Sequence, residues 1–360
     1  MESVYIHIPF CKTICSYCDF CKMFYNSSWA DEYLDVLKEE ILDSYDNDVI
    51  KTIYIGGGTP SCLPKENLIK LFEIIKLFKK SNDLEFTFEC NISDINYELL
   101  NILKINGVNR LSIGVNSFNK KNLEFLERES NYKDVKEKIN LCKALGFNNI
   151  NVDLMYALPN ETLKDLKKDV KKLLSLNITH LSTYSLIIEE HTKVGNSKIN
   201  NIDEDLDYKM YEYICKKARH KKFNHYEVSN FAKKGFESRH NLAYWKNKEY
   251  YGFGLSASGY MMGFRYENTH DIKKYSNHVY RKENNVLSIN DKMENEVMLG
   301  LRLLNGINVK EFYDKYTKNI QNVFPIEPLI KEKLLTFKDG YLKVSEKNIY
   351  ILNEILLKLF

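Results

Sequence analysis

The stretch YIHIPFCKTICSYCDF, Tyr5 to Phe20, decides the fold of this 360-residue chain. It carries Cys11, Cys15 and Cys18 in the spacing C-x3-C-x2-C, directly after a short apolar run. Three closely spaced thiolates can hold three irons of a [4Fe–4S] cluster from one loop, because thiolate is the soft ligand that such clusters need. The fourth iron would then be open to a small molecule. A zinc knuckle and a disulfide are the alternatives, but zinc ribbons favour two separate ligand pairs, so the spacing favours the cluster.

Length and composition bound the class of protein. With 360 residues, 44% of them hydrophobic, the chain can bury a full core and has room for a large and a small domain. Its 52 basic and 49 acidic residues nearly balance at a net charge of +3, so we expect no nucleic-acid partner. No stretch approaches the roughly 20 apolar residues of a membrane span, and the N-terminus lacks the features of a signal peptide. Eight cysteines without such a signal fit a cytoplasmic protein with no integral span, compatible with peripheral membrane contact.

The first two-thirds of the chain alternates short apolar runs with longer amphipathic segments. This alternation is typical of βα units around a parallel sheet. Strands are expected at 3–8, 52–55, 84–89, 110–115, 149–154 and 180–186. Helices are expected at 30–46, 65–80, 97–105, 132–145 and 162–176. Six strands with five intervening helices favour an α/β fold of the partial (β/α)6 barrel type over a doubly wound sheet, although the pattern alone does not choose between them.

The alternation weakens from about residue 202. A helix is expected at 205–221, and the KENN run at 282–285 is expected to be a linker. In the tail, Asp339-Gly340 between two alternating runs indicates a hairpin, and a final helix is expected at 348–357. We therefore expect three parts: a barrel at 1–200, an extension at 201–285, and a small α+β winged-helix-like domain at 286–360.

A second motif, Gly56-Gly57-Gly58-Thr59-Pro60, directly follows an expected strand. Consecutive glycines let backbone N–H and C=O groups approach a ligand without obstruction by side chains. Alone, the motif is equally compatible with an ordinary tight turn between a strand and a helix.

Together, the cysteine loop and GGGTP resemble the radical S-adenosylmethionine (SAM) superfamily. Within it, residues 5–20 resemble the branch of oxygen-independent coproporphyrinogen III oxidases and HemW-type haem chaperones, and the resemblance runs in patches along nearly the whole chain. The resemblance implies a radical SAM barrel and a C-terminal domain of the HemN type. It also implies that Arg128 binds the SAM carboxylate, a role that suits the bidentate guanidinium. A solvated arginine on a helix face is the alternative. The SAM-binding set that the resemblance implies is Tyr5, Gly56, Gly57, Gly58, Thr59, Pro60, Glu89, Asn116, Arg128 and Asp153.

Four positions depart from the family pattern. Ile92 stands where a proline is usual, and Asn116 replaces a glutamine, which keeps the amide but shortens its reach. Ser130 replaces a histidine, and Ala157 replaces a glycine in the motif DLMYALP. These departures weaken the resemblance locally without removing the motifs.

The run RHNLAYW, Arg239 to Trp245, contains a candidate haem contact, His240. Imidazole is a common protein ligand of haem iron, and neighbouring aromatic rings suit a flat porphyrin face. By itself, one histidine beside Tyr and Trp is more often a structural cluster. The run resembles the HNxxYW signature of the haem chaperones, which implies that the extension contacts haem.

Two features favour a chaperone over an oxidase. The oxidases resembled here carry a further cysteine where this chain has Phe20, whereas Cys21 lies one place later and is expected to be a bystander thiol. The oxidases also carry an N-terminal extension before the cluster loop, which begins here at residue 11. We therefore expect a protein that binds a [4Fe–4S] cluster, SAM and haem, and that delivers haem to client apoproteins. The alternative is a radical SAM enzyme that decarboxylates coproporphyrinogen III, which would need an electron donor.

Overall fold

A parallel sheet forms the centre of the protein, as the alternating pattern predicts. The computed structural model describes residues 1–197, 199–200 and 202–360. The six core strands are Ser3–Ile8 (β1), Ile50–Gly57 (β4), Lys80–Asn91 (β5), Arg110–Asn116 (β6), Asn149–Tyr156 (β7) and His180–Ser185 (β8). Each is parallel to the next in chain order. This arrangement confirms the (β/α)6 core.

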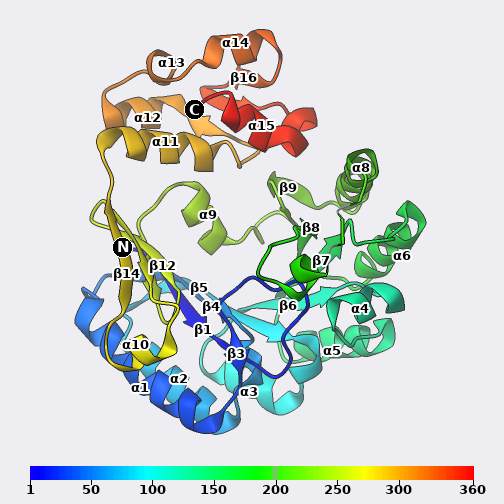
Figure 1. Ribbon diagram of the computed structural model, residues 1–360, viewed down its shortest axis with the longest axis vertical. Helices are drawn as coiled ribbons and strands as arrows, with labels where there is room; N and C mark the ends of the chain where they lie inside the picture. Colours follow the sequence, from blue (N-terminus) through cyan, green and yellow to red (C-terminus); the bar gives the residue numbers. More distant parts are fainter. Residues whose placement is uncertain (198, 201) are drawn as a thin grey trace.

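Helices follow these strands and lie on the outer side of the curved sheet (Figure 1). Asparagine side chains cap several of them: Asn26, Asn96 and Asn131 each accept a hydrogen bond from a backbone N–H in the first turn of the helix that follows. Their bounds are Ser27–Ser44 (α1), Lys65–Ile75 (α2), Tyr97–Ile105 (α3), Lys120–Leu126 (α4), Tyr132–Ala144 (α5), Leu163–Leu173 (α6), Lys193–Asn196 (α7) and Glu204–His220 (α8). The short helix α4 was not predicted.

Alternation along the strands separates an apolar outer face from a polar interior. On β4, Ile53 and Ile55 are fully buried. Thr52, Tyr54 and Gly56 point to the opposite face, because successive side chains of a strand alternate. The barrel interior is therefore lined by groups that can hydrogen-bond.

The extension adds three more strands to the main sheet. Asn230–Ala232 (β10) pairs antiparallel with β8, and Asn224–Glu227 (β9) pairs antiparallel with β10 at the edge of the sheet. Tyr251–Phe253 (β11) pairs in parallel with β1 at the other edge, so the first strand of the chain lies inside the sheet. Between them, Arg239–Trp245 forms helix α9. The sequence analysis did not foresee this return of the chain to β1.

A second, three-stranded sheet follows: Ser258–Met261 (β12), Phe264–Asn268 (β13) and Arg281–Val286 (β14), with helix Ile272–Ser276 (α10) before β14. The linker expected at 282–285 is wrong, because these residues belong to β14. They pair with β13, for example Arg265 with Asn285. The charged run was mistaken for a linker because β14 is an exposed edge strand, and such strands commonly carry charges.

The last part of the chain combines helices with a hairpin. Leu335–Lys338 (β16) and Tyr341–Val344 (β17) pair around Asp339-Gly340, both with positive φ, as the hairpin signal predicts. The other elements are Ile289–Gly300 (α11), Ile307–Asn308 (β15), Val309–Tyr316 (α12), Ile320–Val323 (α13), Ile326–Lys331 (α14) and Leu352–Leu357 (α15), where a 3-10 turn at Glu346–Ile351 shortens the final helix. Figure 1 shows this part packed on the side of the barrel where α9 lies. Within the described residues, no helix combines the length and apolarity that crossing a bilayer requires.

Glu40 of α1 joins the barrel to the extension from a fully buried position. One carboxylate oxygen accepts hydrogen bonds from the Gly254 N–H at 2.8 Å and the Tyr275 hydroxyl at 2.7 Å. The other accepts from the Asn268 amide at 2.7 Å and the Arg281 guanidinium at 3.0 Å. Four donors, one of them the cationic Arg281, thus satisfy a buried carboxylate whose burial would otherwise be costly.

Candidate cluster and cofactor site

The cysteine loop directly follows β1, at the edge where the parallel strands end. Phe10–Cys11 (β2) pairs with Met23–Phe24 (β3), which closes the loop at its base. On its far side, the Ser16 hydroxyl donates to the Phe125 carbonyl at 2.6 Å, and the Val194 N–H donates to the Ser16 carbonyl at 3.1 Å. The loop is therefore held at its base by its own β2–β3 pairing and on its far side by the segments that follow β6 and β8.

The thiols of Cys11, Cys15 and Cys18 are all free, and Cys11 is the most buried of them. Burial raises the pKa of Cys11 to about 11, although the Thr59 hydroxyl donates to its sulfur at 3.5 Å. Among the residues that the structure describes, no group of three or more His, Cys, Asp or Glu is placed to bind a single metal ion. A cluster has a different requirement, because each thiolate binds a separate iron.

The glycines of GGGTP leave space that other side chains of the same protein occupy. A Cβ on Gly56 would lie 2.7 Å from the Glu89 carboxyl carbon, and one on Gly57 would lie 2.6 Å from the His7 ring. Gly57 also has φ +111°, which favours glycine. The motif therefore lets Glu89 and His7 reach positions that side chains would block.

Glu89, at the end of β5, is oriented by two donors from β4. The Tyr54 hydroxyl donates to one carboxylate oxygen at 2.6 Å, and the Gly57 N–H donates to the other at 3.1 Å. Burial raises the pKa of Glu89 to about 7, and Asp153 raises it further, while these two donors and Arg110 oppose the rise. A carboxyl group whose pKa lies near 7 and whose oxygens are oriented by fixed donors can accept a hydrogen bond from a cationic amino group.

A hydrogen bond to His7 orients the Tyr5 hydroxyl. The His7 Nε2 lies 2.8 Å from the Cys21 carbonyl, which can only accept, so Nε2 carries the proton. The other ring nitrogen, 3.0 Å from the Tyr5 hydroxyl, therefore accepts from Tyr5. The Tyr5 oxygen is left with its lone pairs for a donor in the barrel.

Arg128 and Asn116 leave polar atoms free at the same edge. The Arg128 guanidinium donates to the Gly114 carbonyl at 3.1 Å and lies beside Tyr17 and Cys15 of the cysteine loop. Its Nε, like the Oδ1 of Asn116, is buried and has no partner among the described residues. Asn116 ends β6 with φ 65°, a left-handed conformation. An unpaired donor and an unpaired acceptor fit a ligand that carries both carboxylate and hydroxyl groups, as SAM does.

Asp153 lies within a larger polar network on β7 and β8. It accepts a hydrogen bond from the Asn151 amide at 2.8 Å, and burial raises its pKa. The side-chain Oδ1 of Asn151 lies 2.7 Å from His180 Nδ1 and accepts a hydrogen bond from the Ser182 hydroxyl at 3.0 Å. The second ring nitrogen of His180 contacts the Tyr226 hydroxyl at 2.8 Å, so His180 is a satisfied core histidine.

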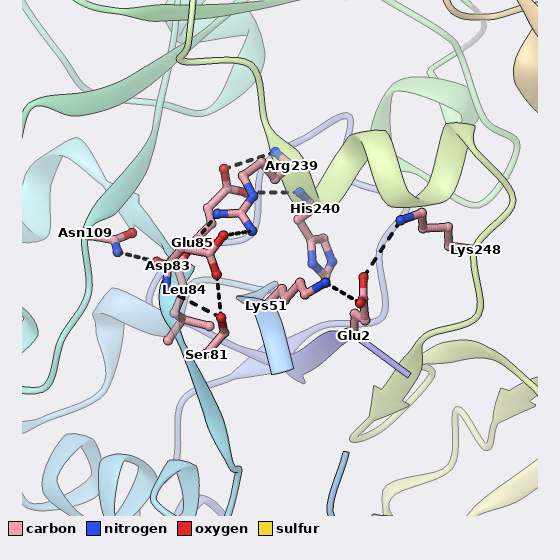
Figure 2. Close-up of polar contacts among 10 residues, drawn as sticks. All are labelled: Glu2, Lys51, Ser81, Asp83, Leu84, Glu85, Asn109, Arg239, His240 and Lys248. Carbon is pink, nitrogen blue, oxygen red and sulfur yellow. Dashed lines mark hydrogen bonds and ion pairs between the residues drawn. The ribbon is translucent and has the colours of Figure 1, made fainter. Parts of the chain in front are cut away.

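His240 does not lie at this edge. It lies on α9 beside Thr52, near the start of β4, at the opposite end of the barrel. It is 1% exposed, and its ring nitrogens contact the Thr52 hydroxyl at 2.9 Å and the Tyr244 hydroxyl at 2.7 Å. Figure 2 shows it pointing inward beneath the start of α9. Neither ring nitrogen is free for an iron in this structure, so the predicted contact of His240 with haem would require the ring to leave both hydroxyl partners.

Sequence reasoning missed three residues of the barrel interior: Arg110, Tyr54 and His7. Arg110 is only 2% exposed, and its one side-chain hydrogen bond among the described residues goes to Thr87 at 3.4 Å. The sequence did contain a signal for them, because each is a polar residue within a strand whose other residues are mostly apolar. Which partner each would meet depends on the register between strands, which a single sequence does not give.

Comparison with known proteins agrees with this geometry. The family model of the radical SAM superfamily matches residues 5–173, and that of the HemN C-terminal domain matches 287–351. Heme chaperone HemW of Bacillus subtilis is 39% identical over 98% of this chain and 96% of its own length. Heme chaperone HemW of Lactococcus lactis shows the same identity and coverage. Among solved structures, the radical SAM enzyme coproporphyrinogen III oxidase (HemN) of Escherichia coli superposes with a TM-score of 0.87 at 22% identity, over 99% of this chain and 89% of its own, which shows the shared fold. The chain therefore belongs to the radical SAM superfamily and, within it, to the family of the heme chaperone HemW.

Proposed function

We propose that this protein is a haem chaperone that binds a [4Fe–4S] cluster and SAM in the barrel, binds haem, and delivers haem to apoproteins. The observation that carries the proposal is the near full-length similarity to chaperones called HemW, at 39% identity. The alternative, a coproporphyrinogen III oxidase, is supported by the likeness of fold to HemN. We also propose the division into a barrel at 1–200, an extension at 201–285 and a C-terminal domain at 286–360.

In this proposal, each residue at the barrel edge has a distinct task. Cys11, Cys15 and Cys18 hold the cluster, which when bound supplies one electron at a time and an open iron for SAM. The Glu89 carboxylate accepts the methionyl amino group beside the GGGTP backbone, and Arg128 donates to the methionyl carboxylate. Three further side chains, Tyr5, Asn116 and Asp153, face the remaining polar groups of SAM.

The edge that holds the cysteine loop offers a surface for haem, whereas α9 holds His240 inside the barrel. Three apolar side chains are exposed there: Phe20 of the cysteine loop at 68%, Tyr184 at the end of β8 at 44%, and Ile187 just after it at 70%. Such side chains suit the flat face of a porphyrin. In this proposal the haem ligand is a residue outside α9, and the spectrum of His240→Ala tests that placement.

The two functions predict opposite results for one sample. The reconstituted protein should bind haem, seen as a Soret band, and should leave coproporphyrinogen III unchanged when SAM and a reductant are supplied. His240→Ala should keep the Soret band, because its ring nitrogens are engaged within the protein. Rapid SAM-dependent formation of protoporphyrinogen would replace the chaperone proposal with the oxidase.

Arg128→Ala should weaken SAM binding to the cluster-loaded protein by on the order of 1.5–3 kcal/mol, the loss typical of a hydrogen bond to a charged group. Isothermal titration under anaerobic conditions measures this change. Arg219→Ala is the matched control, because Arg219 is exposed and pairs with Glu346, far along the chain from the cysteine loop. Equal SAM affinity in Arg128→Ala and the wild type would reduce Arg128 to a structural residue.

A further inference from the structure

Helix α9 is anchored to the barrel by its N-terminus. The two carboxylate oxygens of Glu85, near the start of the buried part of β5, accept hydrogen bonds from the Arg239 and His240 N–H groups, each at 3.0 Å. The Arg239 guanidinium also pairs with Asp83 at 3.1 Å (Figure 2). A carboxylate at this position satisfies unpaired N–H groups and the positive end of the helix. These contacts fix where α9 enters the barrel.

From this anchor, His240 reaches the barrel interior. Its ring contacts two hydroxyl groups, those of Thr52 on β4 and Tyr244 on the next turn of α9. The ring also lies against Tyr54, with centroids 5.2 Å apart and planes tilted by 31°. The imidazole is thus fixed at both nitrogens and supports one face of the Tyr54 ring.

Tyr54 connects His240 to Glu89, one of the proposed SAM-binding residues at the other end of the barrel. Its hydroxyl donates to Glu89 at 2.6 Å, the shorter of the two hydrogen bonds that orient that carboxylate. Register places Thr52 opposite Glu85 and Tyr54 opposite Thr87 on β5. Two strands therefore hold a ladder of polar side chains that runs from α9 at one end of the barrel to Glu89 at the other.

The other end of α9 faces the C-terminal part of the chain. The Arg302 guanidinium lies 5.6 Å from the Trp245 ring, and the Asn247 amide donates to Glu296 of α11 at 3.2 Å. Helix α9 is therefore packed between the barrel interior and the last part of the chain.

We propose that His240 is a positioning residue for SAM binding, which acts through Tyr54 to aim the Glu89 carboxylate. This inference rests on the proposed binding of SAM, and it gives HNLAYW a task other than contact with haem. Removing the imidazole leaves the Tyr54 ring without support on one face, so its hydroxyl no longer holds Glu89 in one orientation.

Loss of the hydrogen bond from Tyr54 would also change the pKa of Glu89. Donation from Tyr54 lowers the pKa of Glu89, while burial raises it. A Tyr54 that swings away therefore leaves a carboxyl that ionises at higher pH, and the ionised form is the one that accepts an ammonium group. The titratable groups close enough to Glu89 for their charges to interact include Tyr5, Tyr54, Arg110, Asp153, Tyr184 and Tyr244.

The test measures SAM affinity against pH for the cluster-loaded full chain. His240→Ala should weaken SAM binding about three- to tenfold, the scale of one lost hydrogen bond, and should move the midpoint of the pH profile upward. His240→Phe keeps a ring against Tyr54 and should restore most of the affinity. His220→Ala, at an exposed histidine at the end of α8, is the control and should match the wild type.

Iron and sulfide content and melting temperature show that the variants are folded and loaded. Where His240→Ala fails to fold, Tyr54→Phe decides, because it removes only the hydroxyl and should produce the same upward move of the midpoint. Unchanged affinity and midpoint in these variants overturn the inference while the proposed function stands. Loss of the Soret band in His240→Ala also overturns it, since His240 would then be a haem ligand. A wild type that does not bind SAM removes the proposed function and the inference together.

Discussion

Replacing Cys11, Cys15 and Cys18 together by alanine is expected to abolish the brown chromophore that anaerobic reconstitution gives the wild type. The reason is that no other described cysteine can take over the three positions. Cys62, Cys90 and Cys142 are buried in the hydrophobic core, and Cys215 lies on α8. Iron and sulfide assays, together with the visible absorption band, measure the loss.

Cys21→Ala is the matched control, because it removes a fourth thiol of the same segment. The Cys21 carbonyl is bonded to His7, and its thiol faces Ser256 rather than the other sulfurs. Iron and sulfide content should therefore stay near the wild-type level. Complete loss of the cluster in Cys21→Ala would show that the ligand assignment is wrong.

Glu40→Ala is expected to lower the free energy of unfolding by on the order of 3–5 kcal/mol, the cost of removing one partner of a buried ion pair. The substitution leaves the donors of Asn268, Tyr275 and Gly254 buried without their acceptor, and Arg281 without its counter-charge. Urea unfolding of the wild type and the variant, followed by circular dichroism, measures the difference.

Glu39→Ala provides the comparison at the neighbouring position. The Glu39 side chain is 56% exposed and pairs with His278 at the surface, so its removal should change stability by less than about 1 kcal/mol. A Glu40→Ala variant as stable as Glu39→Ala would mean that the four hydrogen bonds to Glu40 do not hold the extension on the barrel.

Much of the barrel could be predicted from the sequence because its signals are local. The apolar runs at 3–8 and 110–115 become β1 and β6, and Asp339-Gly340 forms the expected hairpin. The three-residue strand β11 was missed, since it is too short to show a period of its own. Its place beside β1 is set by pairing across most of the chain. The KENN run resembles a linker in composition although it belongs to β14, because an exposed edge strand can be as polar as a loop.

The candidate site was predictable where a motif carries the chemistry. The cysteine loop, GGGTP, Glu89 and Arg128 meet at one edge of the barrel, as parallel strands that end together require. For His240, the motif HNLAYW identifies the residue but not the direction in which its side chain points. Its neighbours are Thr52 and Tyr54, at the end of the barrel opposite the cysteine loop, because α9 packs against β4 from far along the chain, and a single sequence does not reveal such a contact.

The parallel pairing of β1 with β11 sets an order of events during synthesis. β1 and the cysteine loop are synthesised long before β11, so one edge of β1 has no partner until Tyr251 to Phe253 have been made. Contacts between such distant segments form slowly, and an unpaired edge is a template for aggregation. A nascent chain that stalls before Tyr251 therefore presents its three cysteines in a loop that follows a half-paired strand, and a shortened chain that ends there is expected to aggregate.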